Sequence, residues 1–380
     1  MLSGDVWKPS RFYPQLDGLR AAAVTLVLLV HMDDVKMPGP LRFMQQIGWT
    51  GVDVFFVLSG FLITGILLSR KPSPKTLGVF VLRRTLRTWP LYFLILLSAF
   101  FSLRHSDTGA HINWMQHVFF LQNYTAVFVA KSLKPTWSLC VEEHFYLLWP
   151  FVVFLLPRRA LPWLIAVLIA ALPGLRWMGL HSGFTIKQLY TETQFHLDGL
   201  MAGSLIAVVL TRWQFRRRML IGVGVLAMVA GAVASKIGFW GNWNVGTGNN
   251  IIFGFTTVAL TAGGVMMLLL SDSNSLLSRA LAFAPVQYIG RISYGIYLLH
   301  DGFLSVYVKH KKSLPGWVQQ YWFIDIALRF ALIILIAAIS YACFESPILR
   351  LKDRLRYSGP ADDTMAREPE PASEPAATAK

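Results

Sequence analysis

Residues 51–68 read GVDVFFVLSGFLITGILL and contain a single charged side chain, Asp53. A transmembrane helix needs about 20 predominantly apolar residues, and about 17 suffice for the shortest ones. Because the bilayer core holds no water, the backbone of such a segment must satisfy its own hydrogen bonds by forming a helix. This stretch therefore predicts a membrane-spanning helix.

The rest of the chain repeats this pattern. Hydrophobic residues make up 54% of the 380 residues and charged residues 14%, whereas a soluble protein averages about 25% charged residues. Ten candidate spans follow one another at residues 16–35, 51–68, 88–103, 140–156, 161–176, 195–211, 219–234, 251–270, 288–308 and 322–344. The sequence therefore predicts an all-α integral membrane protein with about ten transmembrane helices.

Lysine and arginine are unevenly distributed between these spans. With the N-terminus in the cytoplasm, the inner segments carry most of them, and the outer loops, which include Arg176, carry fewer. The positive-inside rule then places both termini in the cytoplasm. We expect a cytoplasmic segment at 1–15, a transmembrane domain at 16–350 and a cytoplasmic, disordered tail at 351–380. The net charge of +15 gathers on no single basic face or arm, which argues against a nucleic-acid partner.

The first span carries Arg20 and His31, two side chains that are costly at membrane depth. Eleven residues of helix place them within about 20° of the same face and about 16 Å apart along the axis. A guanidinium binds phosphate well, and a neutral imidazole can take a proton from an attacking hydroxyl. The spacing suits a long, anionic substrate. The alternative is an arginine that reaches the inner interface and a histidine at the outer one.

Further polar side chains lie in or beside the other spans, most of them toward the outer half of the membrane. Besides Asp34, which lies at the end of the first span, they are Asp53, Trp137, Ser138, Glu142, His196, Asp198, Ser293, Tyr297 and His300. The last three have spacings of three, four and seven, which align on one helical face. Asp34 either orients the ring of His31 or marks the end of the first span. Each group taken singly is consistent with an interhelical hydrogen bond of about 1 kcal/mol or less; together they predict the lining of one cavity.

A basic run, Arg83-Arg84-Thr85-Leu86-Arg87, precedes the third span on its inner side. Arg84 and Arg87 are three residues apart and share a helix face, and guanidinium groups form strong hydrogen bonds with phosphate oxygens. We interpret the run as a phosphate-binding cluster. The alternative is that it only anchors the span on the cytoplasmic side.

Six motifs occur in the order in which they occur in the acyltransferase 3 family of membrane O-acyltransferases. They are LDGLRA (16–21) with His31, GVDVFFVLSGFLIT (51–64), Arg83/Arg84/Arg87, WSLCVEEHFYLLWP (137–150), GRISYGIYLLH (290–300) and FESP (344–347). The chain thus resembles this family over nearly its whole length. Two positions depart from the family pattern. His196 stands where an arginine usually precedes the aspartate, and Ser346 stands where arginine is frequent.

The resemblance implies a bacterial inner-membrane enzyme that moves a short acyl group, which we expect to be acetyl, from acyl-CoA to a hydroxyl of a saccharide-like acceptor. It places catalytic roles on Arg20, His31 and Glu142. The phosphates of acyl-CoA would contact Arg20 and the arginine run, and the other polar groups would face the acceptor. We expect no metal ion and no fused hydrolase-like domain. Neither the acceptor nor the oligomeric state can be read from the motifs.

Several alternatives stay open at this point. His31 would act either as a general base or as a transient carrier of the acyl group. The 104–139 loop with Trp137 would either shape acceptor choice or form an interfacial aromatic belt. The main alternative function is a transporter or channel with charged residues along its path, but the chain shows no inverted repeat. A non-catalytic sensor with the same fold would not need Arg20, His31 and Glu142 together.

Overall fold

The structure is a computed structural model that describes residues 12–104, 113–125, 131–213, 215–239, 248–355 and 357. Every regular element in these residues is helical, in agreement with the predicted all-α fold. Most of the predicted N-terminal segment at 1–15 and most of the predicted tail at 351–380 lie outside the described residues.

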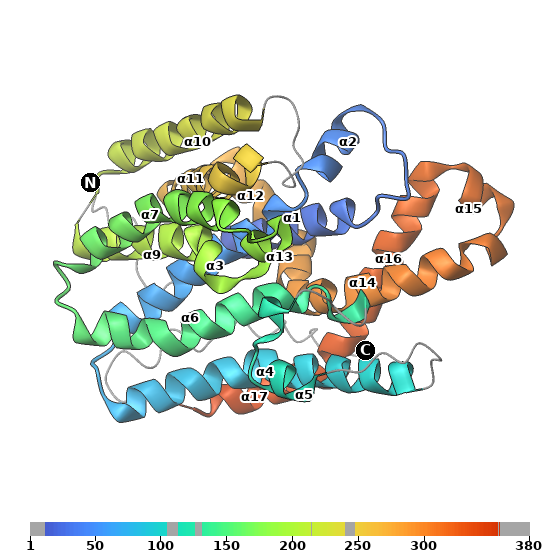
Figure 1. Cartoon of the computed structure of the whole chain (residues 1–380), viewed down its shortest axis with the longest axis horizontal. Coiled ribbons are helices and arrows are strands. Elements are labelled where there is room, and N and C mark those ends of the chain that lie inside the picture. Colours follow the sequence, from blue (N-terminus) through green and yellow to red (C-terminus); the bar gives the residue numbers. More distant parts are fainter. Residues whose placement is uncertain are drawn as a thin grey trace, which may run out of the picture.

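Most of the long helices run roughly along the longest axis of the molecule (Figure 1). In chain order the α-helices are α1 (Pro14–Val30), α2 (Gly39–Gln46), α3 (Thr50–Leu68), α4 (Pro74–Arg104), α5 (Trp114–Val118), α6 (Thr136–Leu155), α7 (Leu161–His181), α8 (Ile186–Thr191), α9 (Asp198–Arg212), α10 (Arg217–Phe239), α11 (Gly248–Ser271), α12 (Leu276–Leu281), α13 (Ala284–Arg291), α14 (Ser293–His310), α15 (Gly316–Gln320), α16 (Trp322–Ser340) and α17 (Ser346–Asp353). Short 3₁₀ turns occur at Gln122–Tyr124, Lys131–Leu133, Thr193–Phe195 and Lys311–Ser313, and a π-helical turn at Tyr341–Glu345.

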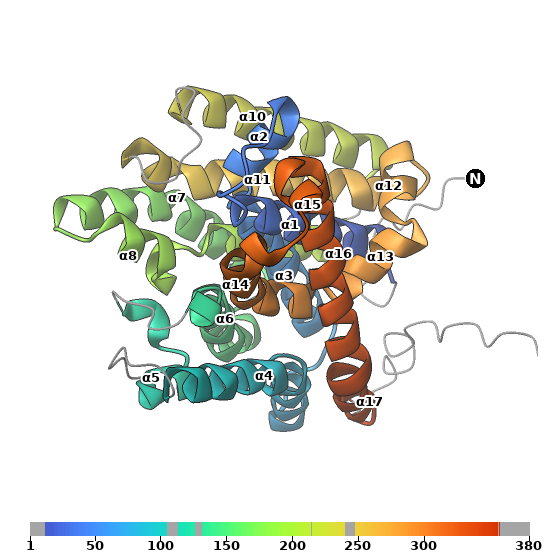
Figure 2. The same ribbon diagram turned by 90° about the vertical axis from the view of Figure 1, so that its right-hand side faces the viewer.

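Helix α1 occupies the middle of the bundle. It packs against α3, α13 and α14, and Figure 2, which looks along many of the helices, shows it enclosed by its neighbours. Its residues Val24, Val27 and Leu28 are almost completely buried, so protein rather than lipid covers this helix. Helix α10 lies at the edge of the bundle and exposes apolar side chains such as Leu226 and Val233, as a lipid-facing helix does.

Helices α3 and α9 approach each other closely because glycines lie at their contact. A Cβ atom added at Gly203 would lie 2.7 Å from the backbone nitrogen of Phe61, and one at Gly199 would lie 2.7 Å from the Cβ of Phe56. Small residues let membrane helices approach until their backbones are in van der Waals contact. The glycines of α9 therefore fix its position against α3, one of the walls of the site described below.

Within the described residues, seven helices are long and apolar enough to cross a membrane by themselves. They are Thr50–Leu68, Pro74–Leu103, Thr136–Leu155, Leu161–His181, Arg217–Lys236, Asn249–Ser271 and Trp322–Lys352, and each overlaps a predicted span. Helices α1, α9 and α14 correspond to the three other predicted spans but do not meet this criterion. The all-helical class and the apolar, membrane-length helices agree with the prediction.

One predicted span is two helices. The 288–308 segment divides into the end of α13 and α14, which meet at Ile292. At this break α13 lies directly against α1, because a Cβ atom added at Gly290 would lie 2.6 Å from the carbonyl carbon of Asp17. The short α13 thus packs closely against the start of α1, and α14 begins as a separate helix after Ile292.

Two predicted positions of arginines are wrong. Helix α4 begins at Pro74, well before the predicted start at 88, so the arginine run lies inside a helix instead of preceding it. Arg176, predicted in an outer loop, is completely buried within α7. Charge alone does not distinguish a loop arginine from one that has a buried partner.

The glycine contact predicts opposite effects for the same substitution at two sites. Gly203→Ala forces a Cβ atom into the backbone of α3 and should lower the thermal unfolding midpoint in detergent, since overpacking costs about 1–3 kcal/mol. Gly222→Ala in α10 meets no described atom within 4 Å. It should be neutral or stabilising, because a helix prefers alanine to glycine by about 1 kcal/mol. Equal midpoints for the two variants would contradict the packing.

Candidate active site

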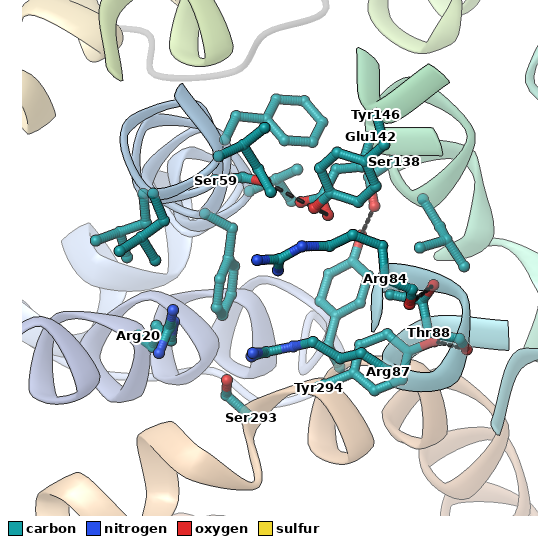
Figure 3. Close-up of a pocket in the computed structure, with 18 of the residues that line it drawn as sticks. Arg20, Ser59, Arg84, Arg87, Thr88, Ser138, Glu142, Tyr146, Ser293 and Tyr294 are labelled. Atoms are coloured by element: carbon teal, nitrogen blue, oxygen red, sulfur yellow. Dashed lines mark hydrogen bonds between the residues drawn. The ribbon is translucent and has the colours of Figure 1, made fainter. Parts of the chain in front are cut away.

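Five helices enclose a cavity that three arginines line, which we call the arginine cavity. Helices α1, α3, α4, α6 and α14 line it with Arg20, Ser59, Arg84, Arg87, Ser138, Glu142, Tyr146, Ser293 and Tyr297, among other side chains. Figure 3 shows the guanidinium groups of Arg84 and Arg87 extending from α4 across the cavity toward α1, which carries Arg20. Three positive charges thus converge from two helices that are distant in the sequence.

The three arginines differ in what compensates their charge. Arg20 pairs with Asp17, which lies one turn earlier on α1. No described carboxylate forms an ion pair with Arg84 or Arg87. A charge removed from water is costly unless it is paired, so these two half-buried guanidinium groups are suited to an anion supplied by a ligand.

Arg83 does not reach this cavity. Its guanidinium donates a hydrogen bond of 2.7 Å to the carbonyl oxygen of Leu355, and it lies 5.5 Å from the centre of the Tyr357 ring. The predicted cluster of three therefore divides in the structure. Arg84 and Arg87 face the cavity, whereas Arg83 holds a segment near the end of the described chain against α4.

The two glutamates of α6 have different partners. Glu142 lines the arginine cavity and accepts a hydrogen bond from the hydroxyl of Tyr146, which bonds in turn with Ser59 of α3 at 2.7 Å. Glu143 accepts hydrogen bonds of 2.8 and 3.1 Å from two side chains of α4 and so ties α6 to α4. Glu142 therefore belongs with the arginines, and His31 lies elsewhere.

A second cavity, which we call the histidine cavity, contains His31. Its lining includes His31, Trp49, Lys134, Trp137, Lys187, Tyr190, Tyr297 and His300. The ring centres of His31 and His300 are 4.6 Å apart, with the rings edge to face. The structure thus brings together two histidines that are far apart in the chain, which the sequence did not predict.

Hydrogen bonds fix the tautomers of both rings. The Nδ1 atoms bond to backbone carbonyl oxygens, that of His31 to Val27 at 2.8 Å and that of His300 to Tyr297. A carbonyl oxygen only accepts, so each neutral ring carries its proton on Nδ1 and keeps Nε2 as a base. The Nε2 of the fully buried His300 has no hydrogen-bond partner among the described atoms.

Tyr297 and Val52 line both cavities and form the wall between them. The Tyr297 hydroxyl lies 2.6 Å from that of Ser138, and it donates a bond of 3.1 Å to the carbonyl of Pro135. Along α14, Ser293 lines the arginine cavity, Tyr297 the wall and His300 the histidine cavity. The predicted polar face of this helix therefore runs past both cavities.

Asp53 and His196, predicted to contact a substrate, are completely buried and are absent from the described lining of either cavity. The Nδ1 of His196 lies 2.6 Å from the carbonyl of Tyr190, and its Nε2 lies 3.0 Å from Asp53. The rings of Phe255 and Trp137 stack on the imidazole, with centres 3.7 and 5.2 Å away. This pair supports Trp137, a wall of the histidine cavity, from behind.

Asp198, also predicted to contact a substrate, binds an arginine instead. Its carboxylate accepts bonds of 2.6 and 3.1 Å from Arg176 and a further bond from Thr256. Asp198 is thus paired with Arg176 of α7. The sequence did contain a sign that Arg176 is buried with a partner. It is the one Lys, Arg, Asp or Glu in the apolar run of α7.

An ionic cluster holds the turn that follows His31. Asp34 accepts bonds of 2.7 and 2.6 Å from the buried Arg329 of α16. Arg329 also binds Asp325, which accepts a bond of 2.6 Å from Lys311. Because His31 is the C-cap residue of α1, fixing this turn fixes the imidazole. The sequence could have indicated this cluster, because Asp325 and Arg329 are an oppositely charged pair four residues apart inside an apolar span.

The two cavities offer different chemistry. Guanidinium groups in one bind anions, and the Nε2 atoms in the other accept protons. Among the described residues, no group of three or more His, Cys, Asp and Glu side chains is placed to hold a metal ion.

Comparison with known proteins adds to this geometry. The sequence model described as an acyltransferase domain matches residues 13–345. The chain is similar to O-acetyltransferase OatA of Staphylococcus aureus, 28% identical over 366 residues that cover 89% of this chain and 57% of the relative. It is 29% identical over 365 residues to peptidoglycan O-acetyltransferase OatA of Listeria monocytogenes, with 89% and 56% covered. The putative peptidoglycan O-acetyltransferase YrhL of Bacillus subtilis is 28% identical over 373 residues, with 89% and 55% covered.

The chain thus spans a little more than half the length of these relatives. No solved structure matches it. The family match begins just before α1, ends at the π-helical turn and includes every residue that lines the two cavities. Because this match covers most of the chain, the protein belongs to the acyltransferase 3 family.

Proposed function

We propose that this enzyme transfers an acetyl group from acetyl-CoA to a hydroxyl of a saccharide on the outer side of the bacterial cytoplasmic membrane. The proposal rests chiefly on the two cavities with the common wall of Tyr297 and Val52. A donor and an acceptor can enter from opposite sides and meet at this wall. The relatives named O-acetyltransferase, two of them for peptidoglycan, support the acetyl group and the saccharide.

The arginine cavity suits the donor. The phosphates of acetyl-CoA would bind Arg84, Arg87 and the remaining donors of Arg20, since guanidinium groups match phosphate oxygens in charge and geometry. Arg20 and His31 are eleven residues apart on α1 and its cap, which corresponds to about 16 Å of rise. The pantetheine arm of CoA has a similar length, so a thioester whose phosphates lie at the arginines would reach the wall at Tyr297.

The histidine cavity suits the acceptor and the proton transfer. The acceptor hydroxyl attacks the thioester carbonyl carbon, and the Nε2 of His31 takes its proton. A C–O bond forms, the C–S bond breaks, and the proton passes to the departing thiolate, giving an ester and free CoA. The Tyr297 hydroxyl, held by Ser138 at 2.6 Å, lies at the wall. On turning away from the carbonyl of Pro135, it would donate its single proton to the developing oxyanion.

We further propose ten spans with both termini in the cytoplasm. The seven long apolar helices would be joined by α1, α9 and α14. These three are largely buried, so their polar side chains meet protein and need less hydropathy than a lipid-facing helix. In Figure 1 the turns that follow α3 and α6 lie at the left end of the bundle, opposite α15. We take this end as cytoplasmic and propose that the arginine cavity opens toward it, where acyl-CoA is available.

The role of His31 can be tested by two substitutions. His31→Ala and His31→Gln should each lower the rate of transfer by about 10²–10⁴-fold, because neither side chain can take the proton, while binding of acetyl-CoA persists. The assay follows CoA released from acetyl-CoA in the presence of a saccharide acceptor; a transporter would release none. His181→Gln is the control, since His181 has the same Nδ1 contact with a carbonyl but lies outside the histidine cavity. Wild-type turnover by His31→Gln would rule out the general base.

The divided arginine run supplies a matched test of the donor site. Arg84→Ala and Arg87→Ala should raise the apparent KM for acetyl-CoA about tenfold to a hundredfold, as expected for a lost charge-assisted bond of about 1.5–3 kcal/mol. Arg83→Ala removes an arginine of the same run that faces away from the cavity and should leave this KM unchanged. An equal rise in the KM for acetyl-CoA in all three variants would contradict direct contact. It would show that the arginines act through long-range electrostatics or through folding.

The topology can be tested by cysteine labelling of intact cells. The background should be Cys343→Ala, because Cys343 is exposed whereas Cys140 is buried. A membrane-impermeant maleimide should label Ser182→Cys and Lys312→Cys, which we place outside. It should miss Lys71→Cys and Arg159→Cys until the cells are opened. All four positions are exposed in the structure, so burial does not explain a difference. Labelling of Lys71→Cys from outside would overturn the orientation.

A further inference from the structure

The histidine cavity has a charge pattern that the general transfer reaction does not require. Lys134, in the segment before α6, and Lys187 of α8 line it together with the two histidines, and no Asp or Glu occurs among its described lining residues. We propose that the cavity selects an acceptor that carries an anionic group, a carboxylate or a phosphate attached to the saccharide, and that Lys134 and Lys187 bind this group. The inference rests on the proposed function and specifies its substrate class.

Lys134 and Lys187 line the same cavity. Both side chains are exposed, which places them at the mouth of the cavity. Partial burial and the neighbouring ammonium of Lys134 both lower the pKa of Lys187. Two ammonium groups at one site repel each other, and an anion placed between them removes that repulsion. The mouth of the cavity is therefore favourable for a negative group.

The mouth is also held in a defined shape. The Asn123 side chain donates a bond of 3.1 Å to the carbonyl of Thr191, and the Thr191 hydroxyl donates one of 3.0 Å back to the carbonyl of Asn123. The Thr191 hydroxyl also lies 3.0 Å from the carbonyl of Lys187 itself. These bonds clamp α8 to the 3₁₀ turn at Gln122–Tyr124, which fixes the backbone that carries Lys187.

The interior of the cavity completes a site for a sugar. Trp137 and Tyr190, whose ring centres are 4.8 Å apart, offer aromatic faces on which the apolar face of a pyranose can pack. The completely buried His300, whose Nε2 has no partner among the described atoms, marks the inner end beside His31. The cavity thus offers an acceptor two ammonium groups, two aromatic rings and two imidazoles.

The test compares two acceptors that differ only in charge. One is the tetrasaccharide of alternating N-acetylglucosamine and N-acetylmuramic acid with free lactyl carboxylates, and the other is the same tetrasaccharide with those carboxylates converted to primary amides. We expect wild-type enzyme to show a higher kcat/KM for the carboxylate form. Raising the salt concentration should reduce this preference, because exposed charges are screened beyond about 10 Å at 0.1 M ionic strength.

The lysines should account for the preference. Exposed ion pairs contribute modestly, so Lys134→Gln and Lys187→Gln should each raise the KM for the carboxylate form about two- to fivefold. The double variant should equalise the two acceptors while the KM for acetyl-CoA stays constant. Lys312→Gln, an exposed lysine outside the described lining of the cavity, should change neither value.

The outcomes separate this inference from the function on which it rests. Transfer to both tetrasaccharides with equal kcat/KM by wild-type enzyme would overturn the inference and leave the transfer reaction standing. Transfer to neither would overturn both. The assay should be repeated in phosphatidylcholine vesicles with and without phosphatidylglycerol. A lysine effect that appears only with the anionic lipid would show that the lysines bind lipid headgroups, and it too would overturn the inference.

Discussion

A polar group that leaves water destabilises a membrane protein unless the protein supplies a partner for it. This constraint divides many of the embedded polar residues of this protein into two sets. Arg176 with Asp198, and Arg329 with Asp34, are pairs in which each guanidinium meets a carboxylate in two-point contact. Arg84, Arg87 and the Nε2 of His300 have no such partner among the described residues, and all three line cavities. The paired groups hold the helices together, and the groups without partners are left for ligands.

The fold was largely predictable because its cause is local. A run of apolar residues must become a helix in a bilayer whatever surrounds it, and each of the seven long helices overlaps a predicted span. The apolar runs do not predict where packing against a neighbouring helix interrupts a helix. The division at Ile292 depends on the close approach of Gly290 to α1, a contact between residues that are far apart in the chain. Nothing within residues 288–308 alone predicts it.

The site was predictable only where one helix determines it. Helix geometry places Arg83 and Arg84 both within about 60° of Arg87, so their spacing could not show that one of them leaves the cavity. Arg83 leaves the cavity because it binds the carbonyl of Leu355, which is 272 residues away in the sequence. Asp53 and His196 were candidates because buried polar groups are frequently functional, but each is the partner of the other. A buried polar residue is therefore a candidate ligand only where it also lines a cavity, which Asp53 and His196 do not.

In the function proposed here, acetyl-CoA binds at the arginines and the acceptor binds at the histidines. On that proposal, the common wall allows transfer across a membrane without the alternating access of a transporter. Acetyl-CoA carries several negative charges, and transferring them through a low-dielectric interior would be prohibitively unfavourable. With guanidinium groups on one side of Tyr297 and imidazoles on the other, the charged part of the donor stays where it binds. The acetyl group that has to pass the wall is small and uncharged. Alternating access is then unnecessary, and a rigid bundle is an advantage because transfer depends on holding the thioester and the hydroxyl in contact. The paired arginines and the glycine contacts between α3 and α9 provide that rigidity.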